Sequence, residues 1–356
     1  MLVEVLKKYL KKETINASYD EALLKVSLEQ SLQTILYPVF ELDEYKKYYI
    51  SWAIKQELFY SIQDEITSLF NKNDIKHIYF KGSVVSKYYD DPSIRTRGDI
   101  DLYVSLADFH KAEDILKENG YVLDDMVLDC SHHTSFKKKG VEIELHFNMF
   151  DSDVKKSWSK LFDNPFLLCD SNDNTLYKFS DTYHFIYSIL HFSHHLRHGA
   201  GIRYMLDFYY MIKKTSIDFI LLNNLLDELD IRVLYENIIN TLDYLSGERF
   251  DDVKIKDIGF FIDYMMSYGI HGNSNNETSV MASAHENKIK YAFNRIFLIN
   301  KNYRRTRYRI LGAHWYLYLL CLIKHWIFLI THKMGSFFKF IFGKNKNKKL
   351  YKDLGV

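Results

Sequence analysis

The sequence predicts an α+β fold, in which a small mixed β-sheet is flanked by helical N- and C-terminal regions. Apolar residues recur at spacings of three and four through residues 1–70 and again after residue 151, which is typical of helices. Residues 71–150 instead alternate short β-prone runs with helical ones. The chain has 356 residues, 47% of them hydrophobic and 26% charged, and only three prolines. This composition leaves little room for disorder and indicates two domains or one large one.

The periodicity divides the chain into three predicted segments. Residues 1–70 form an N-terminal helical region that packs on a core over residues 71–150, and residues 151–356 form a C-terminal helical domain with a basic, aromatic tail. The helical stripe of the first segment contains Ile50, Ile54, Leu58, Ile62, Ile66 and Phe70. In the core we expect strands at 77–80, 99–104, 120–123, 133–137 and 141–147, and a helix near 107–118. The turn signal at 137–140 joins the last two strands as a hairpin.

Two carboxylates separated by one apolar residue mark the strand at 99–104. Because strand side chains alternate, Asp99 and Asp101 project from one face while Ile100 and Leu102 enter the core. Two like charges held this close repel each other unless a cation lies between them. A pair of Mg²⁺ ions is the usual solution where phosphoryl chemistry is done.

A second motif precedes this strand. Lys81-Gly82-Ser83 ends the β-prone run at 77–80, and a helical stretch follows from Val84 to Tyr89. A strand, a Gly-Ser turn and a helix N-terminus aim backbone N–H groups and the positive end of the helix dipole at an anion. Glycine allows close approach of a phosphate, to which the serine hydroxyl can donate. The geometry predicts a phosphate site beside the carboxylates.

The strand at 141–147 supplies further acids. It alternates strictly, so Glu142, Glu144 and His146 share one face of a half-buried strand. Geometry alone does not separate Glu142 from Glu144 as a partner for the Asp-x-Asp pair. Just before the metal strand, Arg95 and Arg97 are both placed to neutralise a triphosphate.

Together these residues resemble the DNA polymerase β-type nucleotidyltransferase superfamily. In detail they are similar to a branch of uncharacterised bacterial nucleotidyltransferases with the pattern Leu-Lys-Gly, Tyr, Arg, Asp-Ile-Asp-Leu-Leu and Glu/Asp-Leu-His-Trp. This chain has Phe80 and Tyr103 where that pattern has leucines, and Phe147 where it has tryptophan. The motif-bearing resemblance covers roughly residues 75–150, and a weaker match lies near residues 190–207.

The resemblance implies a role for each matched residue. Asp99 and Asp101 would hold two Mg²⁺ ions, with Mn²⁺ as an alternative. Glu144 lines up with the third acid of the family, and would complete the site for the ion that activates the attacking hydroxyl and accept its proton. The nucleotide-binding residues would be Lys81, Gly82, Ser83 and Arg95.

The weaker match near residues 190–207 contains four histidines and an Arg–Asp pair. His191, His194, His195 and His198 share one helix face, where they either bind a metal or, as we favour, make polar contacts beside the sheet. Arg203 and Asp207 are four apart on a helix, and we expect them to pair with each other rather than reach the nucleotide.

The C-terminal segment is strongly basic. Residues 301–356 contain thirteen Lys and Arg against one acidic residue, Asp353, a charge of +12 that leaves −11 on residues 1–300 of a chain with net charge +1. The apolar run from Trp315 to Ile330 is broken by Lys324-His325, so it is shorter than a bilayer span requires. The segment fits an anionic membrane surface, an RNA, or a helix packed on the protein itself.

The three cysteines are too widely spaced for a disulfide framework or a zinc site, and the first residues lack a signal-peptide pattern. We therefore expect a cytoplasmic protein, peripheral to the membrane if the tail binds lipid.

The predicted activity is Mg²⁺-dependent transfer of NMP from an NTP to the hydroxyl of a small molecule, glycan precursor or protein. The alternatives are a toxin-like transferase that adds nucleotides to tRNA 3′ ends, and an inactive nucleotide- or membrane-binding module. Base preference, acceptor and oligomeric state stay open.

Overall fold

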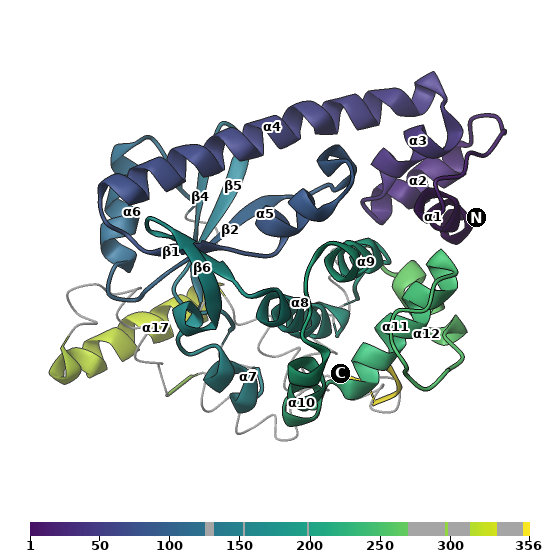
Figure 1. The fold of residues 1–356 in the computed structure, drawn as a ribbon. Coiled ribbons are helices and arrows are strands. Elements are labelled where there is room, and N and C mark those ends of the chain that lie inside the picture. The colour runs from purple at the N-terminus through teal and green to yellow at the C-terminus, as the bar shows by residue number, and fades with distance from the viewer. Residues whose placement is uncertain (125–131, 152–153, 198, 270–295, 298–313, 333–351) are drawn as a thin grey trace.

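The core of the molecule is a seven-stranded mixed β-sheet (Figure 1). The computed structural model describes residues 1–124, 132–151, 154–197, 199–269, 296–297, 314–332 and 352–356. The strands are β1 (His77–Tyr79), β2 (Asp99–Val104), β3 (Val122–Leu123), β4 (His133–Lys138), β5 (Val141–His146), β6 (Cys169–Asp173) and β7 (Leu176–Phe179). Their order across the sheet is β3-β4-β5-β2-β1-β7-β6, with β2 parallel to β5 and β1 parallel to β7. The mixed α/β class matches the sequence-based prediction.

Helices α4 (Asp43–Lys72) and α6 (Phe109–Glu118) contribute to the core on one face of this sheet (Figure 1). Alternation sends the apolar residues of β2 and β5 into this layer, where they pack with the apolar stripe of α4. The buried residues are Ile100, Leu102, Val104, Val141, Ile143, Leu145, Phe59, Ile62, Ile66 and Phe70. The polar residues between them are thereby directed to the opposite face.

Only the second half of α4 covers the sheet. Ile50 and Ile54, predicted to belong to the buried stripe, are 44% and 69% exposed. The reason is length, since α4 runs beyond the sheet toward the N-terminal helices α1 (Leu2–Leu10), α2 (Glu21–Glu29) and α3 (Leu36–Phe40) (Figure 1). These short helices pack in one apolar cluster with the C-terminal helices.

The opposite face of the sheet meets helix α8 (Asp181–Leu196). Its Tyr187 ring lies edge-on to Phe80, with centroids 5.3 Å apart, and Phe80 in turn lies 4.9 Å from the ring of His146. The other helices of this half are α5 (Gly82–Val85), α7 (Lys156–Leu161), α9 (Tyr204–Lys214), α10 (Phe219–Glu228), α11 (Arg232–Ser246) and α12 (Gly259–Ser267).

The prediction that the chain is helical throughout from residue 151 was wrong for one hairpin. Strands β6 and β7 pair antiparallel, and β7 adds to the sheet beside β1. Strand β6 is a polar edge strand, Cys-Asp-Ser-Asn-Asp, and most of it is exposed. It therefore lacks the hydrophobic alternation on which strand prediction depends.

Most of the basic tail lies outside the described residues, including Arg304 to Arg309 and Phe337 to Phe342. Within 314–332, helix α17 (Tyr318–His332) buries Cys321 and Leu322 but leaves Leu319 and Ile327 about three-fifths exposed, at 62% and 58%. Across the described ranges, every helix is too short or too polar to cross a bilayer.

Candidate active site

Strands β2 and β5 bring the predicted carboxylates together. The two strands are parallel neighbours, and their register pairs Asp99 with Glu142 and Asp101 with Glu144. Both pairs lie on the sheet face away from α4, because Ile100 and Ile143 between them are fully buried on the other side. The predicted alternation of both strands is therefore confirmed.

Asp101, Glu144 and His146 form the tightest part of this cluster. The Nε2 atom of His146 lies 3.2 Å from Asp101 Oδ1 and 3.2 Å from Glu144 Oε2. His146 is fully buried and Asp101 is 1% exposed, whereas the side chain of Glu144 is 19% exposed. One ligand atom from each of the three lies within 4.8 Å of the others, which is close enough for a single cation.

Lys81 balances the charge of these carboxylates. Its Nζ donates to Asp101 Oδ1 at 2.7 Å and lies 3.9 Å from Glu144 Oε2. Burial disfavours the ammonium form, but the neighbouring carboxylates outweigh it and raise the pKa of Lys81 well above its usual value. Lys81 has φ 49° and ψ −133°, a conformation that L-residues rarely adopt. Such backbone strain is concentrated at functional sites.

The carboxyl of Asp99 has a different environment from those of Asp101 and Glu144. Burial, followed by the negative charges of Asp101 and Glu144, raises the pKa of Asp99 to about 7. Burial also acts to raise the pKa of Glu144, but the hydrogen bond with His146 and the positive charge of Lys81 hold it well below the usual range. Near neutral pH, Glu144 is ionised and Asp99 is at its titration midpoint.

The Lys81-Gly82-Ser83 turn joins β1 to α5 beside the carboxylates, as predicted. The backbone N–H of Asp101 donates to Ser83 Oγ at 2.9 Å, so this serine ties the turn to the metal strand. Gly82 is required here by space, since a Cβ at this position would come within 2.6 Å of a guanidinium nitrogen of Arg95. Whether Gly82 and Ser83 contact a phosphate stays a prediction.

Arg95 makes a buried ion pair that the sequence did not indicate. Its Nε and Nη2 donate to the two carboxylate oxygens of Asp207 at 2.7 and 2.9 Å, and Tyr89 donates to the same carboxylate at 2.7 Å. Arg203, the predicted partner of Asp207, is 3.6 Å away and is thus the weaker partner. A contact between Arg95 and a triphosphate would require one of its remaining N–H groups or release of Asp207.

Arg97, the other candidate, is also buried. It donates to Gln63 Oε1 at 3.1 Å and its guanidinium lies 4.2 Å from the centre of the Phe59 ring. Burial lowers the pKa of Arg97 to about 10.

The arrangement satisfies the chemistry of a divalent cation site. Asp101 and Glu144 provide carboxylate oxygens, the ligands that Mg²⁺ prefers, within a group that has metal-binding geometry, and Asp99 projects from the same face of the sheet beside Glu142. The ammonium group of Lys81 lies beside Asp101 and Glu144. The residues present therefore fit the ions implied by the resemblance.

A family model described as an uncharacterised nucleotidyltransferase matches residues 22–245, which is more than half of the chain. The chain belongs to this nucleotidyltransferase family. Searches among curated proteins and among solved structures gave no significant match. The match covers the sheet, the carboxylates and helices α8 and α9, so the predicted family is confirmed.

Two further histidines of this nucleotidyltransferase lie at the site and were missed by sequence reasoning. His133 pairs directly with His146 in the β4–β5 register, and His132 precedes it. The three ring centroids are 4.6, 5.2 and 4.8 Å apart. Burial, followed by the charges of the neighbouring histidines, lowers the pKa of His132 far below its usual value, and burial lowers that of His133 to about 4. The hairpin turn at Lys139-Gly140 was the available signal, because it fixes this register.

The histidines of α8 make contacts within the helix. The Nε2 atoms of His191 and His195 are 3.0 Å apart, and the ring of His191 stacks on Tyr187. His198 lies outside the described residues. Among the described residues, neither group with metal-binding geometry includes a histidine of α8.

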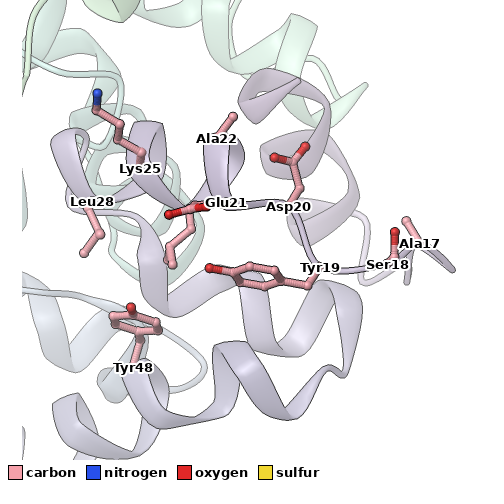
Figure 2. Close-up of a pocket in the computed structure, with 10 residues that line it drawn as sticks. Ala17, Ser18, Tyr19, Asp20, Glu21, Ala22, Lys25, Leu28 and Tyr48 are labelled. Carbon is pink, nitrogen blue, oxygen red and sulfur yellow. The ribbon is translucent and has the colours of Figure 1, made fainter.

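A separate pocket lies among the N-terminal helices (Figure 2). Its lining comes from residues 17–28 and Tyr48, with Tyr19, Glu21 and Lys25 at its wall. It contains none of the candidate catalytic residues.

Proposed function

We propose that this nucleotidyltransferase moves NMP from an NTP to an acceptor hydroxyl, with Mg²⁺ and with release of pyrophosphate. The observation that carries the proposal is the side-by-side placement of Asp101 and Glu144 on parallel strands, opposite the Lys81-Gly82-Ser83 turn. Acids placed in this way serve to position and neutralise a triphosphate. An inactive binding module is less well supported, because such a module has no need of converging acids.

The reaction replaces a phosphoanhydride bond of the NTP with a phosphoester bond to the acceptor. The acceptor oxygen attacks the α-phosphorus, the bond from that phosphorus to the bridging oxygen breaks, and pyrophosphate leaves with the electron pair. Asp99, Asp101 and Glu144 would hold Mg²⁺, which when bound supplies positive charge to the phosphate oxygens. Glu144, ionised at neutral pH, is the proposed acceptor of the hydroxyl proton. Lys81 can release Asp101 and donate instead to the triphosphate.

The direct test uses NTPs labelled at either the α- or the γ-phosphate. With Mg²⁺, the α-label should move to an acceptor from a bacterial extract while the γ-label is recovered in pyrophosphate. Label on tRNA would identify the toxin-like alternative, whereas label on a small molecule, glycan precursor or protein supports the main proposal. Transfer of the γ-label, or simple hydrolysis to NDP, would refute nucleotidyl transfer.

Glu144 and Glu142 provide a matched pair for testing the third acid. Glu144→Gln should lower the transfer rate by roughly 10²–10⁴-fold, the range expected when a general base is lost. Glu142→Gln should stay near the wild-type rate, because Glu144, and not Glu142, is the glutamate that contacts both Lys81 and His146. Single-turnover rates at saturating Mg²⁺ would measure both. Equal losses in the two variants would contradict the assignment of Glu144.

Mg²⁺ binding should strengthen as pH rises through neutrality. Asp99 has its pKa raised to about 7, so below that pH it must release a proton before it can bind a cation. The same shift contributes folded-state stability below the ordinary value of 3.8, and this contribution is lost as pH rises through about 7.

Calorimetry at pH just below 7, in buffers of different ionisation enthalpy, would count the protons released on Mg²⁺ binding. We expect proton release in the wild type and little in Asp99→Asn. Proton release of the same size in both proteins would rule out Asp99 as its source.

A further inference from the structure

Three imidazoles converge beside the carboxylates without a role in the proposed transfer. His133 begins β4 and His132 directly precedes it, and His146 ends β5 directly opposite His133. One ring nitrogen from each lies within 4.8 Å of the others. The cluster thus unites two strand ends that the hairpin brings together.

The burial of this cluster is hard to explain by packing alone. The side chain of His146 is fully excluded from solvent, and that of His133 is only 9% exposed. Although Nε2 of His146 faces the carboxylates, its Nδ1 is buried without a hydrogen-bond partner among the described residues. A buried polar atom of this kind costs about 1–3 kcal/mol unless it is paired or coordinated. A phenylalanine at position 146 would not bury such an atom.

The spacing of the donor atoms suits a small metal ion. Nitrogen ligands of tetrahedral zinc lie 2.0–2.1 Å from the ion, and thus roughly 3.3 Å from one another. In the structure, His133 Nδ1 and His132 Nε2 are 3.2 Å apart, and His133 Nε2 is 3.4 Å from Glu144 Oε1. These two contacts use different ring nitrogens of His133, so a common centre for all the ligands requires the ring of His132 or His133 to turn.

We propose that His132, His133 and His146, with Glu144 as the fourth ligand, form a binding site for a first-row transition-metal dication of the zinc type. Imidazole nitrogens favour such ions, whereas Mg²⁺ takes oxygen ligands almost exclusively. The site adjoins the proposed Mg²⁺ carboxylates through Glu144 but does not depend on nucleotidyl transfer. A bound ion there would fix the orientation of His146, and with it the two acids that His146 contacts.

Metal binding by the full chain, stripped with chelator and free of nucleotide, tests this site. Zn²⁺ calorimetry in excess Mg²⁺ should show one tight site per chain, and Co²⁺ in its place should give the visible absorption bands of tetrahedral nitrogen ligation. His132→Asn/His133→Asn should weaken binding by at least the roughly tenfold that loss of even an outer-sphere partner causes.

Two control variants distinguish Zn²⁺ binding at this cluster from Zn²⁺ binding by other side chains. His195→Asn removes an imidazole from the α8 pair, and Asp99→Asn alters only the proposed Mg²⁺ acids; both should retain tight Zn²⁺ binding. Should the double variant not fold, as judged by circular dichroism, His132→Gln replaces it with the same expectation. The proposal is overturned if the wild type binds no Zn²⁺ in excess Mg²⁺, if the cluster variants bind as tightly as the wild type, or if only His195→Asn loses binding. None of these outcomes bears on transfer itself, which the labelled-NTP assay decides.

Discussion

Asp101→Asn should reduce nucleotidyl transfer about a thousandfold or more, because loss of a metal-binding carboxylate removes several kcal/mol of transition-state stabilisation. Asp101 is the most buried acid of the site, at 1% exposure, and it accepts the short hydrogen bond from Lys81. Asparagine keeps its shape and one acceptor oxygen but removes the charge that a cation requires. Single-turnover transfer of α-labelled NMP at saturating Mg²⁺ measures the effect.

The control for this variant is Asp173→Asn, which removes an exposed carboxylate from the edge strand β6. It should transfer at the wild-type rate. Thermal unfolding of both proteins would establish that they are folded. An Asp101→Asn protein that is folded and keeps more than about a tenth of the wild-type rate, a loss below 1.4 kcal/mol, would contradict the metal-binding role.

The strands that carry the acids were predictable because their sequences show the two-residue alternation of a strand, and because a turn signal joins β4 to β5. Polar and apolar residues alternate over Asp99–Leu102 and Val141–His146, and Lys139 and Gly140 both have positive φ at the hairpin turn. The pairing of β2 with β5 could not be read in the same way. It joins strands separated in the chain by helix α6 and by strands β3 and β4, and only the resemblance linked Glu144 to the Asp-x-Asp motif.

Long-range partners account for what the sequence did not predict. Arg203 and Asp207 satisfied the helical four-residue spacing, yet Asp207 binds Arg95, 112 residues away. Local spacing shows which residues can meet on one helix, and it carries no information on what another element brings to that helix. Likewise the polar strand β6 is held by its pairing with β7 and not by an apolar face of its own.

The same ion pair gives the largest expected change in stability. Arg95→Met should lower the free energy of unfolding by about 3–5 kcal/mol, because it leaves the buried carboxylate of Asp207 without its main partner. Both side chains are less than a tenth exposed, so solvent screens the pair little. Asp207 would keep only the hydroxyl of Tyr89 and the more distant Arg203. Urea unfolding followed by circular dichroism measures the loss.

Two comparisons isolate the buried pair. Lys12→Met removes a lysine that is 80% exposed and pairs with Asp90 on the surface, and it should change stability by only about 0–1 kcal/mol. In Arg95→Met/Asp207→Asn neither member of the pair is left charged without the other, so the double variant should lose less stability than the sum of its single variants. Strict additivity would mean that Arg95 and Asp207 are not coupled.

The pH dependence of this effect follows from the carboxylate. Burial acts to raise the pKa of Asp207, but Arg95 and Arg203 outweigh it and hold the pKa below the ordinary value of 3.8. A depressed pKa contributes stability that is present above 3.8 and is lost as pH falls through the folded-state value. The difference in unfolding free energy between wild type and Arg95→Met should therefore be largest near neutral pH. It should become smaller below about pH 4, where Asp207 of the variant is already protonated. A difference that stays constant down to the acid unfolding transition would mean that lost packing of the arginine side chain, and not the charge of Asp207, causes the instability.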